Sequence, residues 1–228
     1  MQSDHNAAPL NPVPLVVWAL VLPMIAMEIV LSLGASGLMG GPGAVGWRLD
    51  AVERFAFFPE LWQRLWSAQV FPPDHMLRFV AYPFVHGTFT HLAFVVVLTL
   101  ALGKMVAEVF RFWAVLVVFF GAAVTGALAY GAVPGLRAPL IGGYPAVYGL
   151  IGAFTFLLWV NLAAVGANKF RAFTLIGLLL GLQLVWGLAF GGGWDWVAEI
   201  AGFATGFFLS FLVSPGGAAR VLQKLRQR

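Results

Sequence analysis

The chain has 228 residues, of which 61% are hydrophobic and only 10% are charged, whereas soluble globular domains contain about 25% charged residues. Its mean hydropathy is +0.91 and it has no cysteine, so the composition excludes a water-soluble fold, a disordered chain and a secreted disulfide scaffold. Most of the chain is expected to lie in lipid. Every ionisable side chain at membrane depth is therefore a candidate functional residue.

Six apolar runs follow one another along the chain, each close to the roughly 20 residues that a membrane-spanning helix needs. They cover residues 13–33, 84–106, 112–132, 140–160, 173–190 and 194–213. The sequence predicts an all-α polytopic membrane protein with six transmembrane helices in one domain, residues 13–213. This domain lies between an N-terminal tail, residues 1–12, and a basic C-terminal tail, residues 214–228.

The first loop, about residues 34–77, has a pattern of its own. Asp50 followed by Glu53 predicts a helix N-cap with an acidic third residue, and apolar residues then recur at helical spacing until Trp66, interrupted by Pro59. This pattern is typical of an interfacial, partly embedded helical segment with tryptophan anchors. A small soluble cap on the outer face is the alternative.

The net charge of +4 comes from basic residues near the ends of the apolar runs, which is a topology signal and does not indicate nucleic-acid binding. With both termini inside, the inner segments hold eight Lys and Arg residues and the outer segments five. We therefore expect both termini to be cytoplasmic, in a membrane that fits a bacterial inner membrane. The basic tail is expected to bind anionic membrane lipids.

Two histidines, His86 and His91, lie near the start of the second predicted span. Residues five apart do not share a helix face as residues four apart do, so a shared metal ion is not expected, and no cofactor is expected either. The two histidine side chains are expected either to have structural roles or to line a cavity.

The fourth and sixth spans carry small residues at regular spacing. Gly149 and Gly152 in the fourth span, and Gly202 and Gly206 in the sixth, are typical of close helix packing in membranes. Pro145 suits the first turn of a helix.

Three acidic residues lie within the six apolar runs. Glu199 lies about one turn inside the last span and is expected to face the bundle or a wet cavity. Glu28 lies inside the first span, and two roles fit its side chain. It either contacts a partner or is a buried carboxyl that stays neutral. Asp195, between two tryptophans, predicts an N-cap at the start of the last span.

In this order these residues resemble the rhomboid family of intramembrane serine proteases, which has six helices. The resemblance covers residues 78–206. It rests on Arg78, His86, His91, Leu92 and Gly103 around the second span, on Tyr148, Gly149 and Gly152 in the fourth, on Ala198, Gly202 and Gly206 in the sixth, and on a Trp47-Arg48 pair in the first loop.

The resemblance also implies catalytic residues that this chain lacks. Active members begin the fourth helix with Gly-x-Ser-Gly, whose serine is the nucleophile, and here Tyr144 takes that place. Glu199 takes the place of the general-base histidine of the sixth helix. Val95 takes the place of the asparagine that donates to the oxyanion, so only His86 and His91 remain of a polar cavity. The chain is identified as a catalytically degenerate member.

These replacements argue against proteolysis. A tyrosine hydroxyl has a pKa near 10, Pro145 lacks an N–H, and losing one oxyanion donor typically lowers a rate by about 10²–10³-fold. A hydrogen bond between Tyr144 and Glu199 is expected to lock the fourth and sixth helices.

The favoured prediction for function is an integral membrane pseudoprotease. It would bind transmembrane helices of other membrane proteins for assembly, retention or quality control without cleaving them. Two alternatives stay open. One is an active intramembrane peptidase with unconventional residues, and the other is a small-molecule or ion translocator that uses Glu28 and Glu199.

Overall fold

The computed structural model describes residues 12–190 and 193–217. Within these ranges five helices are long and apolar enough to cross a membrane: α1 (Leu15–Ala35), α6 (Phe89–Ala107), α7 (Phe112–Gly131), α8 (Tyr144–Ala164) and α10 (Asp195–Val213). The predicted fifth span corresponds to α9 (Thr174–Phe190), which has 17 residues and so lies at the short end of spanning lengths. The all-α prediction is confirmed.

Two of the predicted spans start too early. The second begins at Phe89 and not at residue 84, because Thr88 takes extended backbone angles and its hydroxyl accepts a hydrogen bond from the His91 backbone N–H. The fourth begins at Tyr144 and not at residue 140, since Gly142 has a φ of +85°, which no helix accommodates. Apolar composition alone does not reveal where either helix starts.

The loop between the first two spans is helical, as predicted. It contains η1 (Pro42–Gly46), α2 (Trp47–Phe55), α3 (Pro59–Ala68), α4 (Pro73–Met76), α5 (Arg78–Ala81) and η2 (Tyr82–Phe84). The predicted N-cap at Asp50 is wrong, because α2 already begins at Trp47 and Asp50 lies in its first turn. Pro59 separates α2 from α3 as expected.

Aromatic packing attaches α3 to the helical bundle. The ring of Trp62 meets Phe79 edge-on with centroids 5.1 Å apart, and Phe57 packs against the same Phe79 at 4.9 Å. Aromatic pairs of this geometry contribute about 0.5–1.5 kcal/mol beyond their buried area. Whether the segment is embedded in the membrane interface stays a prediction.

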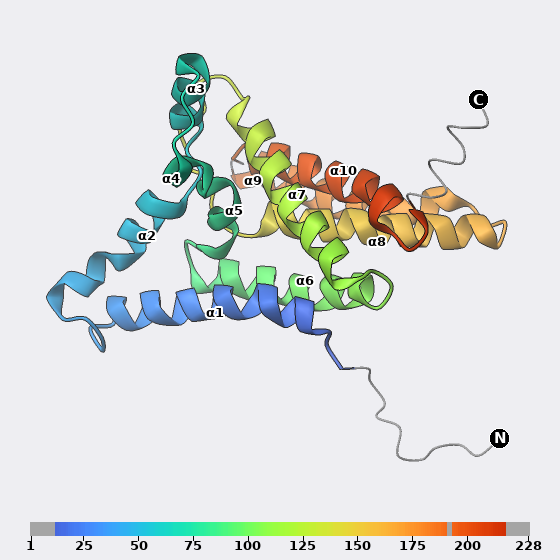
Figure 1. Cartoon of the computed structure of the whole chain (residues 1–228), viewed down its shortest axis with the longest axis horizontal. Coiled ribbons are helices and arrows are strands. Elements are labelled where there is room, and N and C mark those ends of the chain that lie inside the picture. Colours follow the sequence, from blue (N-terminus) through green and yellow to red (C-terminus); the bar gives the residue numbers. More distant parts are fainter. Residues whose placement is uncertain (1–11, 191–192, 218–228) are drawn as a thin grey trace, which may run out of the picture.

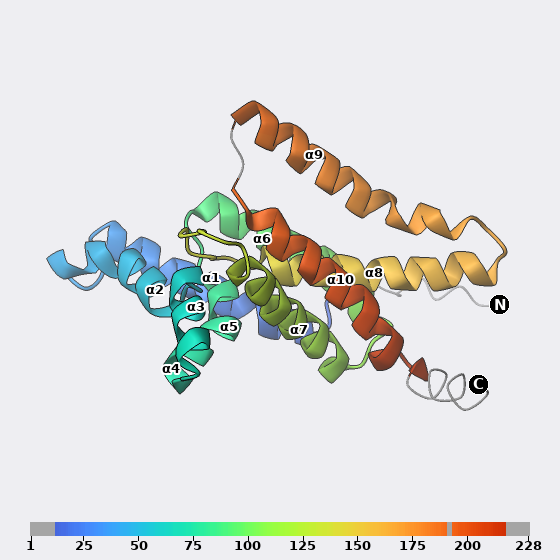
Figure 2. The same cartoon turned by 90° about the horizontal axis from the view of Figure 1, so that it is seen from above.

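The six long helices are not equally packed (Figure 1). In the bundle α8 lies between α6, α7 and α10, and α1 packs against α6. Within the described ranges α9 packs chiefly on η3 (Lys169–Phe173), the turn that precedes it. Figure 2 shows α9 diverging from α8 with increasing distance from η3.

Small residues bring α8 and α10 into backbone contact. A methyl group added to Gly206 would overlap the carbonyl of Gly149, and one added to Gly152 would overlap the carbonyl of Phe203. A methyl group on Gly202 would overlap the carbonyl of Pro145. Because lipid is as apolar as the helices, such close packing is what holds membrane helices together.

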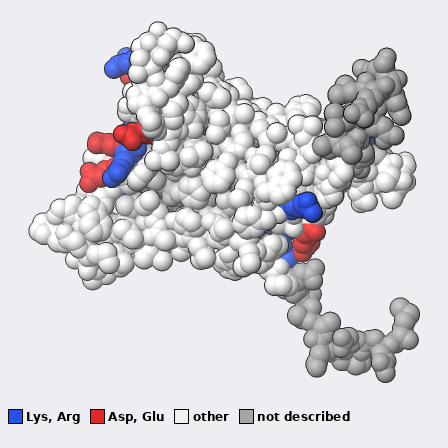
Figure 3. All heavy atoms as spheres, viewed as in Figure 1, with Lys and Arg blue, Asp and Glu red and all other residues white. Residues whose placement is uncertain are grey.

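The charged side chains at the surface gather in separate groups. Figure 3 shows Lys, Arg, Asp and Glu of the visible face in two groups with a broad uncharged band between them. Such a band is what a membrane-spanning domain requires. Most of the two predicted tails, residues 1–11 and 218–228, lies outside the described residues.

Candidate functional site

A cavity of about 1060 Å³ opens at the end of the bundle where α6, α8 and α10 begin. It lies between α8, α10 and the diverging α9. The described residues that line it include aromatic, apolar and acidic side chains: His91, Phe94, Tyr130, Leu136, Ala138, Pro139, Leu140, Ile141, Tyr144, Pro145, Tyr148, Leu179, Leu182, Gln183, Gly193, Trp194, Asp195 and Glu199.

Tyr144 reaches the cavity because of the turn before α8. Gly142 has positive φ, and a methyl group there would overlap the His91 ring, so only glycine allows this turn. Pro145 occupies the first turn of α8, as the sequence predicts. The half-buried Tyr144 ring then stacks on His91, with centroids 4.9 Å apart and planes 14° apart.

Glu199 has a different partner from the one expected. Its side chain is 5% exposed, and its Oε2 accepts a hydrogen bond of 2.6 Å from Nε2 of Gln183 on α9. The predicted hydrogen bond to Tyr144 is absent from the described part of the chain, because Tyr144 lies against His91. The Gln183 bond links α10 to α9, and toward α8 the hydrogen-bond partner of Glu199 is Tyr148 and not Tyr144.

The two histidines pack on each other. The ring of His86 meets that of His91 edge-on with centroids 5.0 Å apart, but only His91 lines the cavity. His86 is 1% exposed, and burial, together with the neighbouring His91, lowers its pKa to about 4. The imidazole of His86 is therefore neutral at physiological pH.

Val95 lies beside the cavity without lining it. The side chain is fully buried and stands against Gly143, the residue before Tyr144. An isopropyl group has no hydrogen-bond donor. The turn before α8 therefore meets an apolar surface at this point.

The described lining contains no Ser, Thr, Cys or Lys. Its hydroxyl groups belong to Tyr130, Tyr144 and Tyr148, and Tyr148 lies beside Glu199. Nucleophilic catalysis needs a nucleophile with a base in hydrogen-bond reach, and the Tyr144 ring is instead covered by His91. In the described ranges no group of three or more His, Asp or Glu side chains could hold a metal ion.

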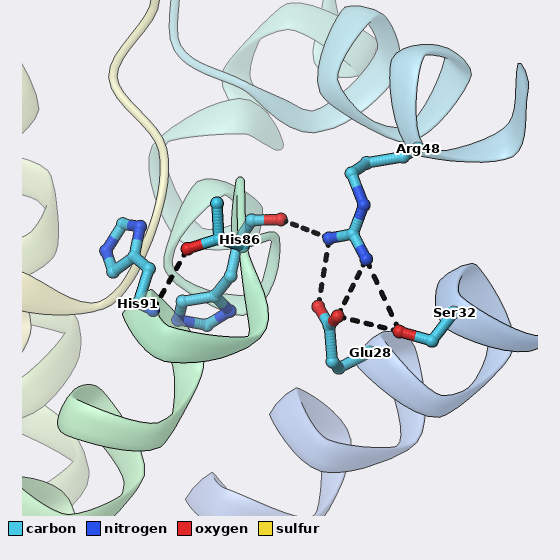
Figure 4. Close-up of polar contacts among 6 residues, drawn as sticks. Glu28, Ser32, Arg48, His86 and His91 are labelled. Atoms are coloured by element: carbon cyan, nitrogen blue, oxygen red, sulfur yellow. Dashed lines mark hydrogen bonds and ion pairs between the residues drawn. The ribbon is translucent and has the colours of Figure 1, made fainter. Parts of the chain in front are cut away.

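The second intramembrane acid belongs to a separate network (Figure 4). Arg48 of α2 reaches Glu28 of α1 with both terminal nitrogens, Nη2 to Oε1 at 2.7 Å and Nη1 to Oε2 at 3.0 Å. Nη1 also donates to the His86 carbonyl at 2.7 Å, and Ser32 donates to Glu28 at 2.9 Å. The hydrogen bond to Glu28 raises the pKa of Arg48. This network joins α1, α2 and the segment before α6.

Three features of the site escaped the sequence analysis. Gln183 is the one amide in the apolar run of α9, and this isolation was a usable signal. The partner of Glu28 was not predicted, because Arg48 is 20 residues away in the chain. Asp195 is the first residue of α10 and lines the cavity, whereas the sequence placed it at the N-cap, a position that Trp194 takes.

A family model described as a Rhomboid domain matches residues 73–216, more than half of the chain. No curated protein matches the chain.

Proposed function

The chain belongs to the rhomboid family, and we propose that it binds transmembrane helices of other membrane proteins without cleaving them. It is an integral membrane protein. In the proposed role it assembles, retains or monitors its partners, with both termini in the cytoplasm of a bacterium and its basic tail on anionic inner-membrane lipid.

This proposal rests on which residue types line the cavity. The positions that resemble the family's serine, histidine and asparagine hold Tyr144, Glu199 and Val95. No Ser, Thr or Cys is among the described lining residues to take over as nucleophile. A carboxylate at Glu199 cannot restore the activity alone, because the Tyr144 ring is stacked on His91 and Glu199 already accepts a hydrogen bond from Gln183.

The packing of α9 supports binding of a helix from the lipid side. Leu178 is 67% and Leu182 62% exposed, so α9 presents an apolar face beside the cavity. The Gln183–Glu199 bond is a link between α9 and α10 that a single side-chain rotation can release. A partner helix can therefore contact the cavity by displacing α9, without disturbing the glycine contacts between α8 and α10.

Translocation receives less support. A pathway built on the two intramembrane acids would need both in one cavity. Arg48 binds Glu28 on the side of His86 that faces away from His91 (Figure 4). Glu28 therefore does not line the cavity that contains Glu199 and His91.

The test is a cleavage and capture assay with purified protein in proteoliposomes. A panel of tagged transmembrane substrates is incubated with wild-type protein, with Tyr144→Phe and with Glu199→Gln, beside an active rhomboid protease as positive control. We expect intact substrates that co-purify with the wild-type protein. Fragments formed by the wild-type protein and abolished by either substitution would establish an active peptidase and contradict the proposal.

A further inference from the structure

We propose that the cavity selects partner helices that carry a lysine or arginine side chain near the membrane interface. This inference rests on the proposed function and names the chemistry by which the cavity recognises its partner. It follows from the charges, unpaired atoms and aromatic walls of the cavity.

The cavity has acidic groups, and the described residues around it include no Lys or Arg to balance them. Asp195 and Glu199 are four residues apart, so they lie on the same face of α10, one turn apart. Asp195 is exposed and Glu199 is 5% exposed, which places one acid at the mouth and the other deeper. No Lys or Arg is among the described lining residues.

The hydrogen-bond partners of Glu199, the Gln183 amide and the Tyr148 hydroxyl, carry no charge that would neutralise it. Gln183 donates one amide hydrogen bond, which supplies a dipole but no charge. A buried carboxylate is expensive unless it is paired with a cation or takes up a proton. Glu28, which is equally buried, shows the paired alternative in the same molecule, since Arg48 binds it with two hydrogen bonds.

The cavity lining also holds a hydrogen-bond acceptor without a partner. The carbonyl oxygen Oε1 of Gln183 is buried without a partner, next to the carboxylate that its own amide nitrogen binds. A lysine ammonium has three donors and no acceptor, and an arginine guanidinium has five donors. Either group has enough donors to bond to Gln183 and Glu199, and its charge also complements Asp195 one turn away.

The cavity walls suit a cation as well. Tyr144, Tyr148 and Trp194 contribute aromatic rings to the lining, and the face of an aromatic ring attracts a cation by about 0.5–2 kcal/mol. The aliphatic stem of a lysine or arginine packs on the apolar residues Leu179 and Leu182 of the same lining.

A partner helix fits these features better than a lipid headgroup. Zwitterionic lipids bring a phosphate together with their ammonium group, and the described lining has no Lys or Arg to receive it. A basic residue in a helix costs about 2.5–3.5 kcal/mol at the bilayer centre, and part of this cost remains wherever its side chain is held away from water. A helix with such a residue therefore gains from contact with the acidic cavity more than a fully apolar helix does.

The test measures binding of synthetic transmembrane peptides to the protein in phosphatidylcholine vesicles, by fluorescence energy transfer. The peptides are identical except for one position near the interface, which is lysine, its uncharged isostere norleucine, or glutamate. We expect the lysine peptide to bind at least about 10-fold more tightly than the norleucine peptide, and the glutamate peptide to bind most weakly. Glu199→Gln and Asp195→Asn should each reduce the lysine preference by at least about 3-fold, and the exposed Glu108→Gln at the far end of α6 should preserve it.

The outcomes separate the inference from the proposed function. Equal binding of the lysine and norleucine peptides would overturn the inference, while leaving helix binding intact. Absence of binding for all three peptides would overturn the proposed function as well. A lysine preference that disappears when phosphatidylethanolamine replaces phosphatidylcholine would assign the cavity to a lipid ammonium group and overturn the choice of a helix.

Discussion

Glu28 and Glu199 are both 5% exposed inside membrane helices, yet their surroundings differ in kind. Glu28 binds a cation through two hydrogen bonds and accepts a third bond from Ser32. Glu199 accepts a bond from the neutral amide of Gln183 and faces a cavity of about 1060 Å³. One acid has its counter-charge within the chain, and the other is open to a ligand.

The helices around the two acids also differ in how closely they pack against the rest of the molecule. The Glu28 network joins α1 to α2 and to the backbone of His86, so it stabilises the packed part of the molecule. The Glu199 bond connects α10 to α9, the long helix that packs chiefly on its own preceding turn. Burial of a charged group therefore does not by itself reveal its role. Its hydrogen-bond partners, and how closely their helices pack against the bundle, distinguish a scaffold contact from a site residue.

The largest expected effect comes from removing the cation of the paired acid. Arg48→Ala leaves Glu28 buried without its counter-charge and should lower the free energy of unfolding by about 3–5 kcal/mol, measured by denaturant titration in detergent micelles. The matched control is Arg64→Ala, whose side chain is 80% exposed and 3.9 Å from Glu60; it should change stability by at most about 0.5 kcal/mol. Equal effects of the two substitutions would remove the distinction between the paired acid and a surface pair.

The second effect is a pH dependence from His86. Its pKa is about 4 in the folded state against 6.5 for a free side chain, so the unfolded state binds the additional proton as the pH falls. Stability should be full above about pH 6.5 and should fall by up to about 3 kcal/mol as the pH decreases to about 4. His86→Phe should flatten this part of the profile. Parallel profiles for the variant and the wild-type protein would show that His86 does not cause the dependence.

The third effect tests the close contact between α8 and α10, the helix that carries Glu199. Gly206→Leu places a side chain against the backbone of Gly149 and should destabilise the protein by about 1–3 kcal/mol. Gly177→Leu on α9 faces open space and should cause little change. Thermal unfolding of the two variants provides the measurement, and a comparable loss in both would contradict the close packing of α8 and α10.

The smallest effect is expected at the open acid. Glu199→Gln keeps the size of the side chain and removes a buried charge that has no counter-charge, so the free energy of unfolding should stay within about 1 kcal/mol of the wild-type value or rise. The same replacement at the paired acid, Glu28→Gln, should lower it by at least about 2 kcal/mol. Equal losses in denaturant titrations would show that Glu199 is also part of the scaffold.

Most of the fold could be predicted from the sequence, because apolar runs of spanning length are a strong signal. The helix starts at Phe89 and Tyr144 were missed by a few residues, since they depend on the Thr88 cap and on the positive φ of Gly142. Gly202 and Gly206 were expected to pack closely from their spacing alone, and they lie at backbone contact with α8.

The site was less accessible from the sequence, because side-chain pairing depends on distances in space. Glu199 was expected to face the bundle or a cavity, and it does, but its predicted partner, Tyr144, was wrong. A pattern of residues along the chain gives no information on how far α9 stands from α10. The ion pair between Glu28 and Arg48 joins residues on two helices whose angle no local pattern specifies.

The central claim is that the cavity holds a transmembrane helix without cutting it. The most direct measurement is photo-crosslinking from Leu182, a lining residue of α9, replaced by benzoylphenylalanine in proteoliposomes that contain a lysine-bearing transmembrane peptide. Intact mass should show an adduct with the full-length peptide, and the same probe at Leu22, an exposed residue of α1, should show none. An adduct with a truncated peptide, absent when Tyr144→Phe is introduced, would contradict the claim.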